Sequence, residues 1–309
     1  MSERSERILD ACDSPHERRY HVVHRTTYRY ASPMTDGYTV AHLLPRDTPR
    51  QRVFQSAVTV TPEPTERDEH VDPFGNRVIQ FGVHHPHDEL VVEADSLVDV
   101  DDPTPIADVE AWNDVAARID VLRGDEALDV GPFRARTRFV DLDRVGVELA
   151  GIAYEAFTPG RGTIEAAQDL CHRIFADFTY DSAATEISTP LADVLTSRRG
   201  VCQDFAHLAA GCLRSIGLAS RYVSGYIETR PPLGQDRVVG ADASHAWCSI
   251  WTPSAGWIDF DPTNDHFPTR RHITVAWGRD YADVTPVRGV VIGPSRAQTL
   301  DVAVDVALV

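Results

Sequence analysis

Residues 199–217 decide how the rest of the chain is arranged, and they read RGVCQDFAHLAAGCLRSIG. Gly200 predicts a turn, and apolar side chains then recur at the three- and four-residue spacing of a helix with one buried face. These apolar side chains are Phe205, Leu208, Ala209, Cys212, Leu213 and Ile216. Gly217 follows at the position where many helices end with glycine. The stretch therefore predicts a helix that begins near Cys202 and packs on a core.

Cys202 would lie in the first turn of this helix. Free backbone N–H groups and the helix dipole favour a negative charge there, so a thiol at this place ionises more readily to the nucleophilic thiolate. The alternative is that Cys202 is a small buried hydrophobic residue, as many cysteines are. The helix alone leaves both interpretations open.

A predicted β-hairpin follows at residues 243–261. Residues 243–251 (ASHAWCSIW) alternate and are rich in aromatic and branched side chains, residues 252–256 (TPSAG) predict a turn, and residues 257–261 (WIDFD) predict a second strand. Pro262 stops that strand because proline has no N–H for the ladder.

The hairpin places a carboxylate beside His245. With residues 252–256 as the loop, Trp251 faces Trp257, and Asp261 becomes the diagonal neighbour of His245 on the same face. Asp259 shares that face but lies two positions further away. A one-residue bulge would change this count.

Cysteine at a helix N-terminus, with histidine and aspartate on a following hairpin, supplies the parts of a Cys-His-Asp nucleophilic site. The imidazole takes the thiol proton and later returns it to a leaving group, while the carboxylate fixes the orientation of the imidazole and stabilises the imidazolium. Cys202 and His245 are 43 positions apart, so only the fold can bring them together.

Three blocks of the sequence closely resemble the core of the transglutaminase-like superfamily, in the order and at the spacing of that family. They are GVCQDFA at 200–206, SHAW at 244–247 and GWIDFDPTN at 256–264. The resemblance implies a papain-like fold with Cys202 as nucleophile, His245 as base and Asp261 as the orienting carboxylate. It extends to the bacterial branch with a β-rich N-terminal region through HRTTYRY at 24–30, LPR at 44–46, DPFGN at 72–76 and GRDYADV at 278–284.

The predicted fold is α+β and has two main parts. We expect a disordered polar tail at 1–18, an N-terminal antiparallel β-sandwich domain at 19–102, a helical connector at 103–160, a transglutaminase-like catalytic core at 161–275 and a C-terminal segment at 276–309. Helical spacing occurs at 101–122, 140–157 and 163–178 with Thr163 as N-cap, whereas 124–131 and 229–243 predict loops. Leu300, Val302, Val304 and Val306 alternate with polar or small residues, which predicts a strand that buries these four side chains by returning to the N-terminal domain.

An acyl-transfer site also needs donors for the oxyanion of the tetrahedral intermediate. The backbone N–H of Cys202 is one candidate, and the hydroxyl of Tyr180, just upstream in a family-like FTYD segment, is the other. Tyr180 could instead be a core aromatic whose hydroxyl is satisfied elsewhere. Asp204 is interpreted as a cap for backbone N–H groups, because a carboxylate touching the thiol would oppose its ionisation.

Composition restricts the partners. The formal net charge of −17 argues against non-specific binding to nucleic acid and to anionic membranes, and no apolar run reaches the length of a membrane helix. Five cysteines without paired spacing and a polar, charged N-terminus are typical of a cytoplasmic protein without a disulfide framework.

The expected function is cysteine-dependent acyl transfer or hydrolysis on a protein or peptide amide, with an amine or water as acceptor and without a cofactor. A protease or amidase of the same fold is the nearest alternative. A structural metal site built from Cys, His and Asp, or a non-catalytic binding module, remains open as a different class.

Overall fold

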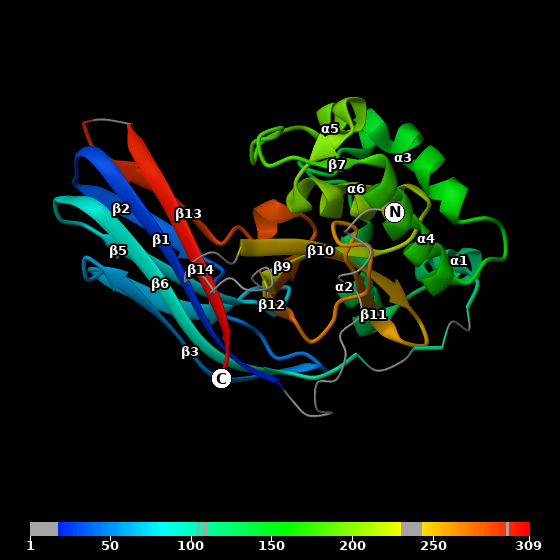
Figure 1. Cartoon of the computed structure of the whole chain (residues 1–309), viewed down its shortest axis with the longest axis horizontal. Helices are drawn as coiled ribbons and strands as arrows, with labels where there is room; N and C mark the ends of the chain where they lie inside the picture. Colours follow the sequence, from blue (N-terminus) through cyan, green and yellow to red (C-terminus); the bar gives the residue numbers. More distant parts are fainter. Residues whose placement is uncertain (1–17, 104–105, 108–109, 230–242, 295–296) are drawn as a thin grey trace, which may run out of the picture.

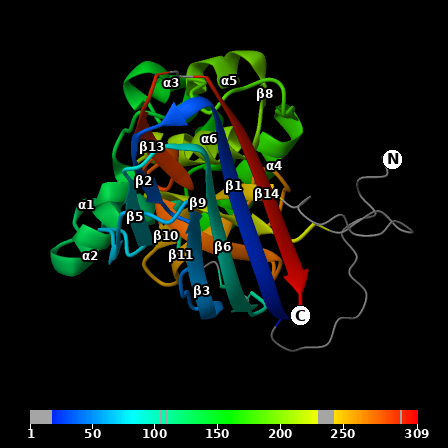
Figure 2. The ribbon, with the colours of Figure 1, turned by 90° about the vertical axis from the view of Figure 1, so that its left-hand side faces the viewer.

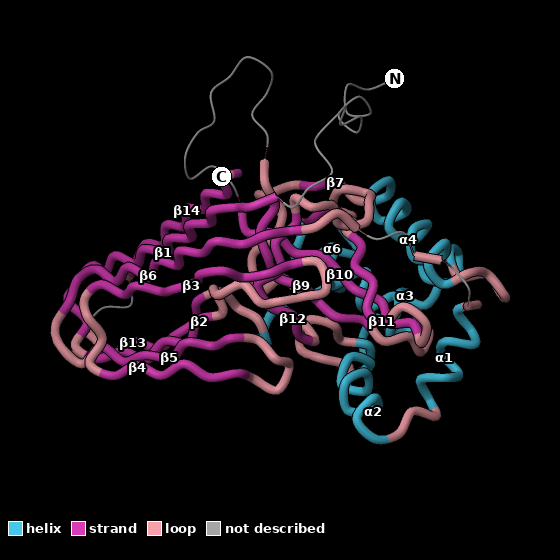
Figure 3. The backbone as a smooth tube through the Cα atoms, turned by 90° about the horizontal axis from the view of Figure 1, so that it is seen from below, coloured by secondary structure: helices cyan, strands magenta, loops and turns pink. Residues whose placement is uncertain are grey.

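The structure is a computed structural model of the 309-residue chain, and it describes residues 18–103, 106–107, 110–229, 243–294 and 297–309. Nearly all of the expected polar tail, Cys12 and most of the predicted loop at 229–243 lie outside the described residues. The described part is α+β, with strands extending from one end and helices gathered at the other (Figures 1 and 3). Within it, no helix is long and apolar enough to cross a membrane.

Two four-stranded antiparallel sheets form the N-terminal β domain, in the orders β14-β1-β6-β3 and β13-β2-β5-β4. The strands are β1 (Arg18–Met34), β2 (Asp36–Ala41), β3 (Gln51–Thr61), β4 (Glu66–Val71), β5 (Arg77–Val83), β6 (His87–Val100), β13 (Val287–Ile292) and β14 (Gln298–Leu308). Figure 2 shows β14 beside β1, at the edge of its sheet. The last two strands of the chain therefore complete two sheets that its first six strands begin.

The C-terminal strand β14 pairs antiparallel with β1, and its burial differs from the sequence expectation. Val304 and Val306 are 1% and 0% exposed, because they pack into an apolar cluster shared with the catalytic sheet. Leu300 and Val302 lie on the same face but are 53% and 49% exposed. Alternation predicted the shared face correctly, but burial also depends on what covers that face, and the cover reaches only two of the four side chains.

The segment predicted as the catalytic core contains a four-stranded antiparallel sheet in the order β11-β10-β9-β12, named the catalytic sheet after that prediction. Its strands are β9 (Ser220–Ile227), β10 (Ala243–Thr252), β11 (Gly256–Phe260) and β12 (His272–Gly278), and a short parallel pair joins β7 (Thr179–Tyr180) to β8 (Arg199–Gly200). The helices are α1 (Trp112–Asp120), α2 (Gly124–Val130), α3 (Leu142–Ala156), α4 (Thr163–Asp177), α5 (Leu191–Ser197) and α6 (Cys202–Ser215), with short 3₁₀ turns at Gly131–Arg134 and Tyr281–Asp283. Helix α6 packs on β9 and β10 and is surrounded by α3, α4 and α5.

Two local predictions were wrong. The segment 124–131, expected to be a loop, contains α2, a helix of seven residues that is too short to show a periodic pattern. Helix α4 is capped by Gly162, whereas Thr163 is its first residue and is fully buried, with its hydroxyl donating to the carbonyl of Glu110 at 2.8 Å.

The N-terminal domain covers the edge of the catalytic sheet through two side-chain amides. Gln51 donates to the carbonyl of Thr274 at 2.7 Å and accepts from its N–H at 2.8 Å. Asn76 makes the equivalent pair with Trp277, at 2.8 Å and 2.9 Å. Backbone groups of β12 at an otherwise open edge are thereby satisfied, so the two domains share hydrogen bonds as well as an apolar interface.

Candidate active site

Helix α6 begins at Cys202, which is partly exposed. Asp204 stands two positions further on, and its carboxylate accepts the N–H of Val201 at 2.9 Å and the hydroxyl of Thr185 at 2.7 Å. Burial raises the pKa of Asp204, although these two hydrogen bonds oppose the effect. Asp204 therefore fixes the start of the helix, which is the capping role that the sequence indicated.

Gly200 allows the chain to approach this helix closely. A Cβ at Gly200 would lie 2.9 Å from the Cβ and from a carboxylate oxygen of Asp204. Gly200 also pairs in parallel with Tyr180, so the β7–β8 bridge brings Tyr180 alongside the segment that leads into Cys202. The Tyr180 side chain is 52% exposed, and its pKa is raised by partial burial and by the nearby Cys202. Tyr180 is thus a surface residue beside the thiol rather than a core aromatic.

The hairpin β10–β11 has the register counted from the sequence: Trp251 pairs with Trp257, and the ladder continues to Cys248 and Phe260. Immediately after β11, the carboxylate of Asp261 lies 2.7 Å from Nε2 of His245. Both side chains are buried, at 0% and 7% exposure. The structure therefore brings His245 and Asp261 together in a hydrogen-bonded ion pair.

His245 also joins this carboxylate to the cysteine. Burial lowers the pKa of His245, but the charge of Asp261, their hydrogen bond and a hydrogen bond with the Cys202 side chain outweigh burial and raise the pKa well above its ordinary value. Because Nε2 contacts Asp261, Nδ1 is left for the thiol. The imidazolium form of His245 is therefore favoured, and it lies against the Cys202 side chain.

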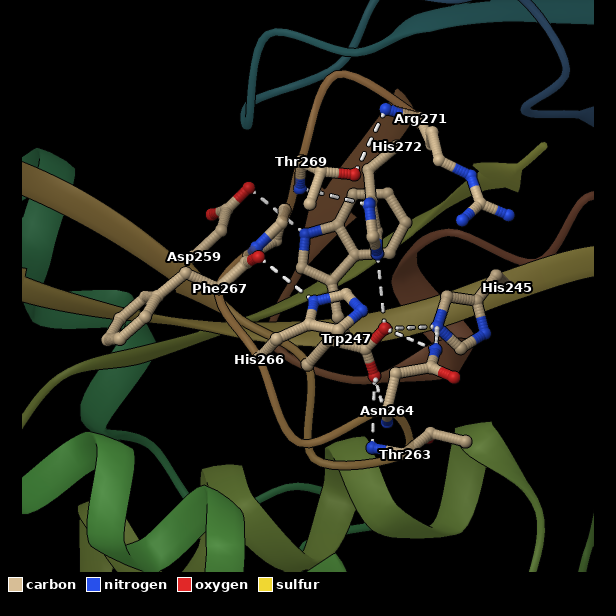
Figure 4. A network of polar contacts seen from close by, with 12 residues as sticks. His245, Trp247, Asp259, Thr263, Asn264, His266, Phe267, Thr269, Arg271 and His272 are labelled. Carbon is tan, nitrogen blue, oxygen red and sulfur yellow. Dashed lines mark hydrogen bonds and ion pairs between the residues drawn. The ribbon is translucent and has the colours of Figure 1, made fainter. Parts of the chain in front are cut away.

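Five hydrogen bonds surround the carboxylate of Asp261 (Figure 4). Oδ1 accepts the backbone N–H groups of Thr263 at 2.9 Å and Asn264 at 3.3 Å, while Oδ2 accepts from His245, from the Asn264 amide at 2.7 Å and from His272 at 3.1 Å. Burial alone would raise the pKa of Asp261, but the charge and hydrogen bonds of His245, together with His272, hold it well below its usual range. Asp261 therefore remains an anion in a buried site.

Sequence reasoning missed His272. It is the first residue of β12, 27 positions after His245, and only the pairing of β12 and β10 with the two sides of β9 brings the two rings to the same carboxylate. The alternating segment HITVAWG at 272–278 could have predicted a strand, but nothing in it indicates contact with Asp261.

Three possible metal ligands meet here, since His245, Asp261 and His272 offer atoms within 4.8 Å of one another. A metal-bound histidine normally donates its second ring N–H to an acceptor. Nδ1 of His272 instead accepts the backbone N–H of Thr269 at 3.2 Å, so Nε2 carries the ring proton and is directed at Asp261. This arrangement fits a hydrogen-bonded carboxylate and does not fit a bound cation.

Comparison with known proteins gives two family matches. Residues 20–99 match the bacterial transglutaminase-like N-terminal region, and residues 151–262 match the transglutaminase-like superfamily. An uncharacterized protein of Mycobacterium tuberculosis is 43% identical over 299 residues, which cover 93% of this chain and 92% of that protein. This chain belongs to the transglutaminase-like superfamily.

Two further relatives bear on this transglutaminase-like protein. A protein-glutamine gamma-glutamyltransferase of Pseudomonas aeruginosa is 36% identical over 104 residues, covering 33% of this chain and 15% of that enzyme. The solved structure of a candidate cysteine protease from Cytophaga hutchinsonii has a TM-score of 0.72 at 20% identity and covers 95% of this chain and 91% of its own. That structural likeness shows a shared fold across both domains.

The N-terminal motifs of this transglutaminase-like protein meet at the domain interface. The guanidinium of Arg46 lies 3.3 Å from the ring centroid of Trp277 and donates to Asn76 at 2.6 Å and to the carbonyl of Phe74 at 3.1 Å. Burial lowers the pKa of Arg46 to about 10, although the nearby Asp72 partly offsets the effect. The LPR and DPFGN motifs therefore fasten the β domain to the strand that begins with His272.

Proposed function

We propose that this protein is a cysteine-dependent acyltransferase or amidohydrolase that forms a thioester between Cys202 and the acyl group of an amide. The observation that carries the proposal is the position of His245, which contacts the Cys202 side chain and, through Nε2, the buried carboxylate of Asp261. One ring can then serve as acid in the first half of the reaction and as base in the second.

The proposed first half-reaction begins with the Cys202 thiolate and the His245 imidazolium. The sulfur attacks the amide carbon, and the carbonyl oxygen becomes an oxyanion that the Cys202 backbone N–H and the Tyr180 hydroxyl would stabilise. The carbon–nitrogen bond breaks, and His245 gives its proton to the leaving nitrogen. The products are a thioester and ammonia, or an amine if a peptide bond is the substrate.

In the second half-reaction, neutral His245 takes a proton from an incoming amine or water, which attacks the thioester. Collapse of the second tetrahedral intermediate releases the thiolate and a new amide or a carboxylic acid. Asp261 stays an anion throughout and stabilises each imidazolium. The triad is the same for transfer and hydrolysis, so the choice between them depends on which acceptor reaches the thioester.

A glutamine side chain is our preferred acyl donor. The similarity to a protein-glutamine gamma-glutamyltransferase over 104 residues supports this choice. Peptide-bond hydrolysis is the second candidate, because a protein with the same fold is described as a candidate cysteine protease, and a main-chain amide would react by the same thioester steps. Either substrate would be a protein or peptide, and neither route needs a cofactor.

The test is to incubate the protein with a blocked glutamine peptide, with and without hydroxylamine as amine acceptor, and to measure ammonia, hydroxamate and glutamate. We expect ammonia from the wild type and none from Cys202→Ala or His245→Ala. Hydroxamate indicates transfer, and glutamate indicates hydrolysis.

A peptide library read by mass spectrometry detects cleavage, and metal analysis of the purified protein checks the metal alternative. A Cys202→Ala variant that keeps all the activities of the wild type would overturn the proposal.

A further inference from the structure

His272 is a buried histidine next to the candidate triad, with 4% exposure. Its Nε2 lies 3.1 Å from Asp261 Oδ2, the same oxygen that receives Nε2 of His245 at 2.7 Å. The two rings lie 6.0 Å apart, so His272 reaches the base only through the carboxylate.

The protonation state of His272 follows from its neighbours. The backbone N–H of Thr269 can only donate, so Nδ1 of His272 accepts and carries no proton. The pKa of His272 is lowered to about 4, chiefly by burial, which outweighs the hydrogen bond and charge of Asp261 and is assisted by the nearby His245 and His266. At neutral pH the ring is therefore an uncharged donor, with its single N–H directed at Asp261.

The turn at Thr269 and the ring of Trp247 hold this donor in one orientation. Trp247 meets the ring edge to face at 5.3 Å, and His266 meets it at 5.4 Å with nearly perpendicular planes. The backbone N–H of His272 donates to the carbonyl of Thr269 at 3.1 Å, which closes a tight turn just before β12. Figure 4 shows His272, Trp247 and His266 grouped on one side of the network and His245 on the other.

We propose that His272 is a positioning residue of the reaction, which holds Oδ2 of Asp261 toward His245 through a neutral Nε2–H donor. Its two ring nitrogens bond the Thr269 backbone and Asp261, so it acts on the base through Asp261. This inference rests on the function proposed above.

The chemistry explains why a second histidine suits this place. A buried carboxylate that lacks a donor pays a desolvation cost and turns toward whichever donors remain. Oδ1 accepts the backbone N–H groups of Thr263 and Asn264, and the side-chain amide of Asn264 shares Oδ2 with the two histidines. Without His272, only His245 and the Asn264 amide would hold Oδ2, and the imidazolium of His245 would lose part of its support. A cationic residue at 272 would neutralise the charge of Asp261 that stabilises the His245 imidazolium, whereas a neutral donor leaves that charge to His245.

Four variants distinguish the loss of the His272 hydrogen-bond donor from the loss of packing around its ring. His272→Leu removes the donor at similar volume, and His272→Gln places an amide N–H near the position of Nε2. His272→Asn has an amide too short to reach Asp261, so it reports the same loss if the leucine variant fails to fold. His266→Leu removes a neighbouring ring that makes no side-chain contact with Asp261, and it serves as the matched packing control. For each protein we would measure the rate of Cys202 alkylation by iodoacetamide against pH, kcat and KM with the glutamine peptide, and the melting temperature.

We expect His272→Leu to move the midpoint of Cys202 alkylation upward by about one pH unit. It should also lower kcat about 10- to 100-fold, as for loss of a hydrogen bond to a charged group, with KM within about twofold of wild type. His272→Gln should regain most of both losses, and His266→Leu should keep the wild-type midpoint whatever its melting temperature.

A wild-type midpoint and kcat in His272→Leu or His272→Asn would overturn the inference, as would a glutamine variant that behaves like the leucine variant. Failure of the proposed function gives a different result. In that case wild-type Cys202 releases no ammonia and is alkylated no faster than an unactivated thiol.

Discussion

The indole N–H of Trp247 donates to Oδ2 of Asp259 at 3.0 Å, and the hydroxyl of Ser249 donates to the other oxygen of the same carboxylate. Asp259 is therefore held by Ser249, its partner on β10, and by Trp247 on the same strand. Asp261 lies beyond the end of the β10–β11 ladder and is free to meet His245. Asp259 and Asp261, which are two positions apart, thus have different partners.

We expect Asp261→Asn to reduce kcat by about 10⁴-fold, because an amide in place of the carboxylate leaves the wrong imidazole tautomer and no charge to stabilise the imidazolium. Asp259→Asn is the matched control: it should keep activity within about tenfold and lower the melting temperature, since it disturbs Trp247 and Ser249. Steady-state kinetics and thermal unfolding of both variants provide the measurement. Equal losses of kcat in the two would contradict the assignment.

Among the described cysteines, Cys202 should be alkylated first. Burial raises the pKa of Cys171, Cys212 and Cys248, and all three side chains are at most 2% exposed. Cys202 is partly exposed and contacts His245. Iodoacetamide labelling of the folded protein at pH 7 with peptide mapping should find Cys202 modified at least tenfold faster than the three buried thiols. Faster labelling of Cys248 would refute the assignment of Cys202 as the nucleophile.

The hairpin register could be predicted because a two-residue side-chain period leaves little freedom once the turn is located; the turn itself is shorter than expected, since Thr252 already pairs with Gly256. The position of Cys202 at the start of α6 followed similarly from helical spacing and Gly217, whose φ of +88° suits glycine. Both features depend on residues close in sequence.

His272 and β13 show what local patterns miss. His272 contacts Asp261 because β9 lies between β10 and β12 in the sheet, and strand order is not encoded in the alternation of any one strand. The apolar run at Val290–Ile292 belongs to β13, yet these three side chains are between 40% and 67% exposed, so their hydrophobicity did not indicate core burial. Whether an apolar strand residue is buried depends on the elements that pack against its strand.

The domain interface offers a test at Asn76, which is 0% exposed. Asn76→Ala would leave the N–H and the carbonyl of Trp277 without partners and would remove the acceptor for Arg46. We expect a loss of about 3 kcal/mol or more in the free energy of unfolding. Asn113→Ala, at an exposed site where the side chain bonds Asp114 and the backbone N–H of Gly160, should cost less than about 1 kcal/mol. Urea denaturation measures both, and equal costs would show that Asn76 does not join the domains.

Stability should fall as pH decreases from about 6.5 to 4, because burial lowers the pKa of His24 and His272 to about 4 and that of His207 to about 3. The unfolded chain binds protons at these histidines below pH 6.5 while the folded chain does not, and each contributes about 1.4 kcal/mol per pH unit. His24→Gln should weaken this dependence by one proton even if it lowers stability at pH 7, since His24 bonds Tyr226 and Thr26. Urea unfolding between pH 4.5 and 7 measures the slope. An unchanged or steeper slope in His24→Gln would contradict the assignment.

The C-terminal strand β14 should stabilise both domains, and the alternating apolar residues Leu300, Val302, Val304 and Val306 allow this to be tested within one strand. Val304 and Val306 fill the cluster between the sheet of β1 and the catalytic sheet, whereas Leu300 and Val302 are half exposed on the same face. Val304→Ala and Val306→Ala should each lower the free energy of unfolding by about 1–3 kcal/mol, and Leu300→Ala and Val302→Ala by less than about 1 kcal/mol.

Deleting residues 299–309 removes the strand on one side of β1 and both buried valines. The deletion should therefore lower the melting temperature of the whole protein and promote aggregation at the exposed edge. Thermal unfolding and light scattering measure these effects. A truncated protein that stays monomeric with the wild-type melting curve would show that β14 is an appendage, and equal costs for the exposed and buried pairs would show that its contact with the catalytic sheet contributes nothing.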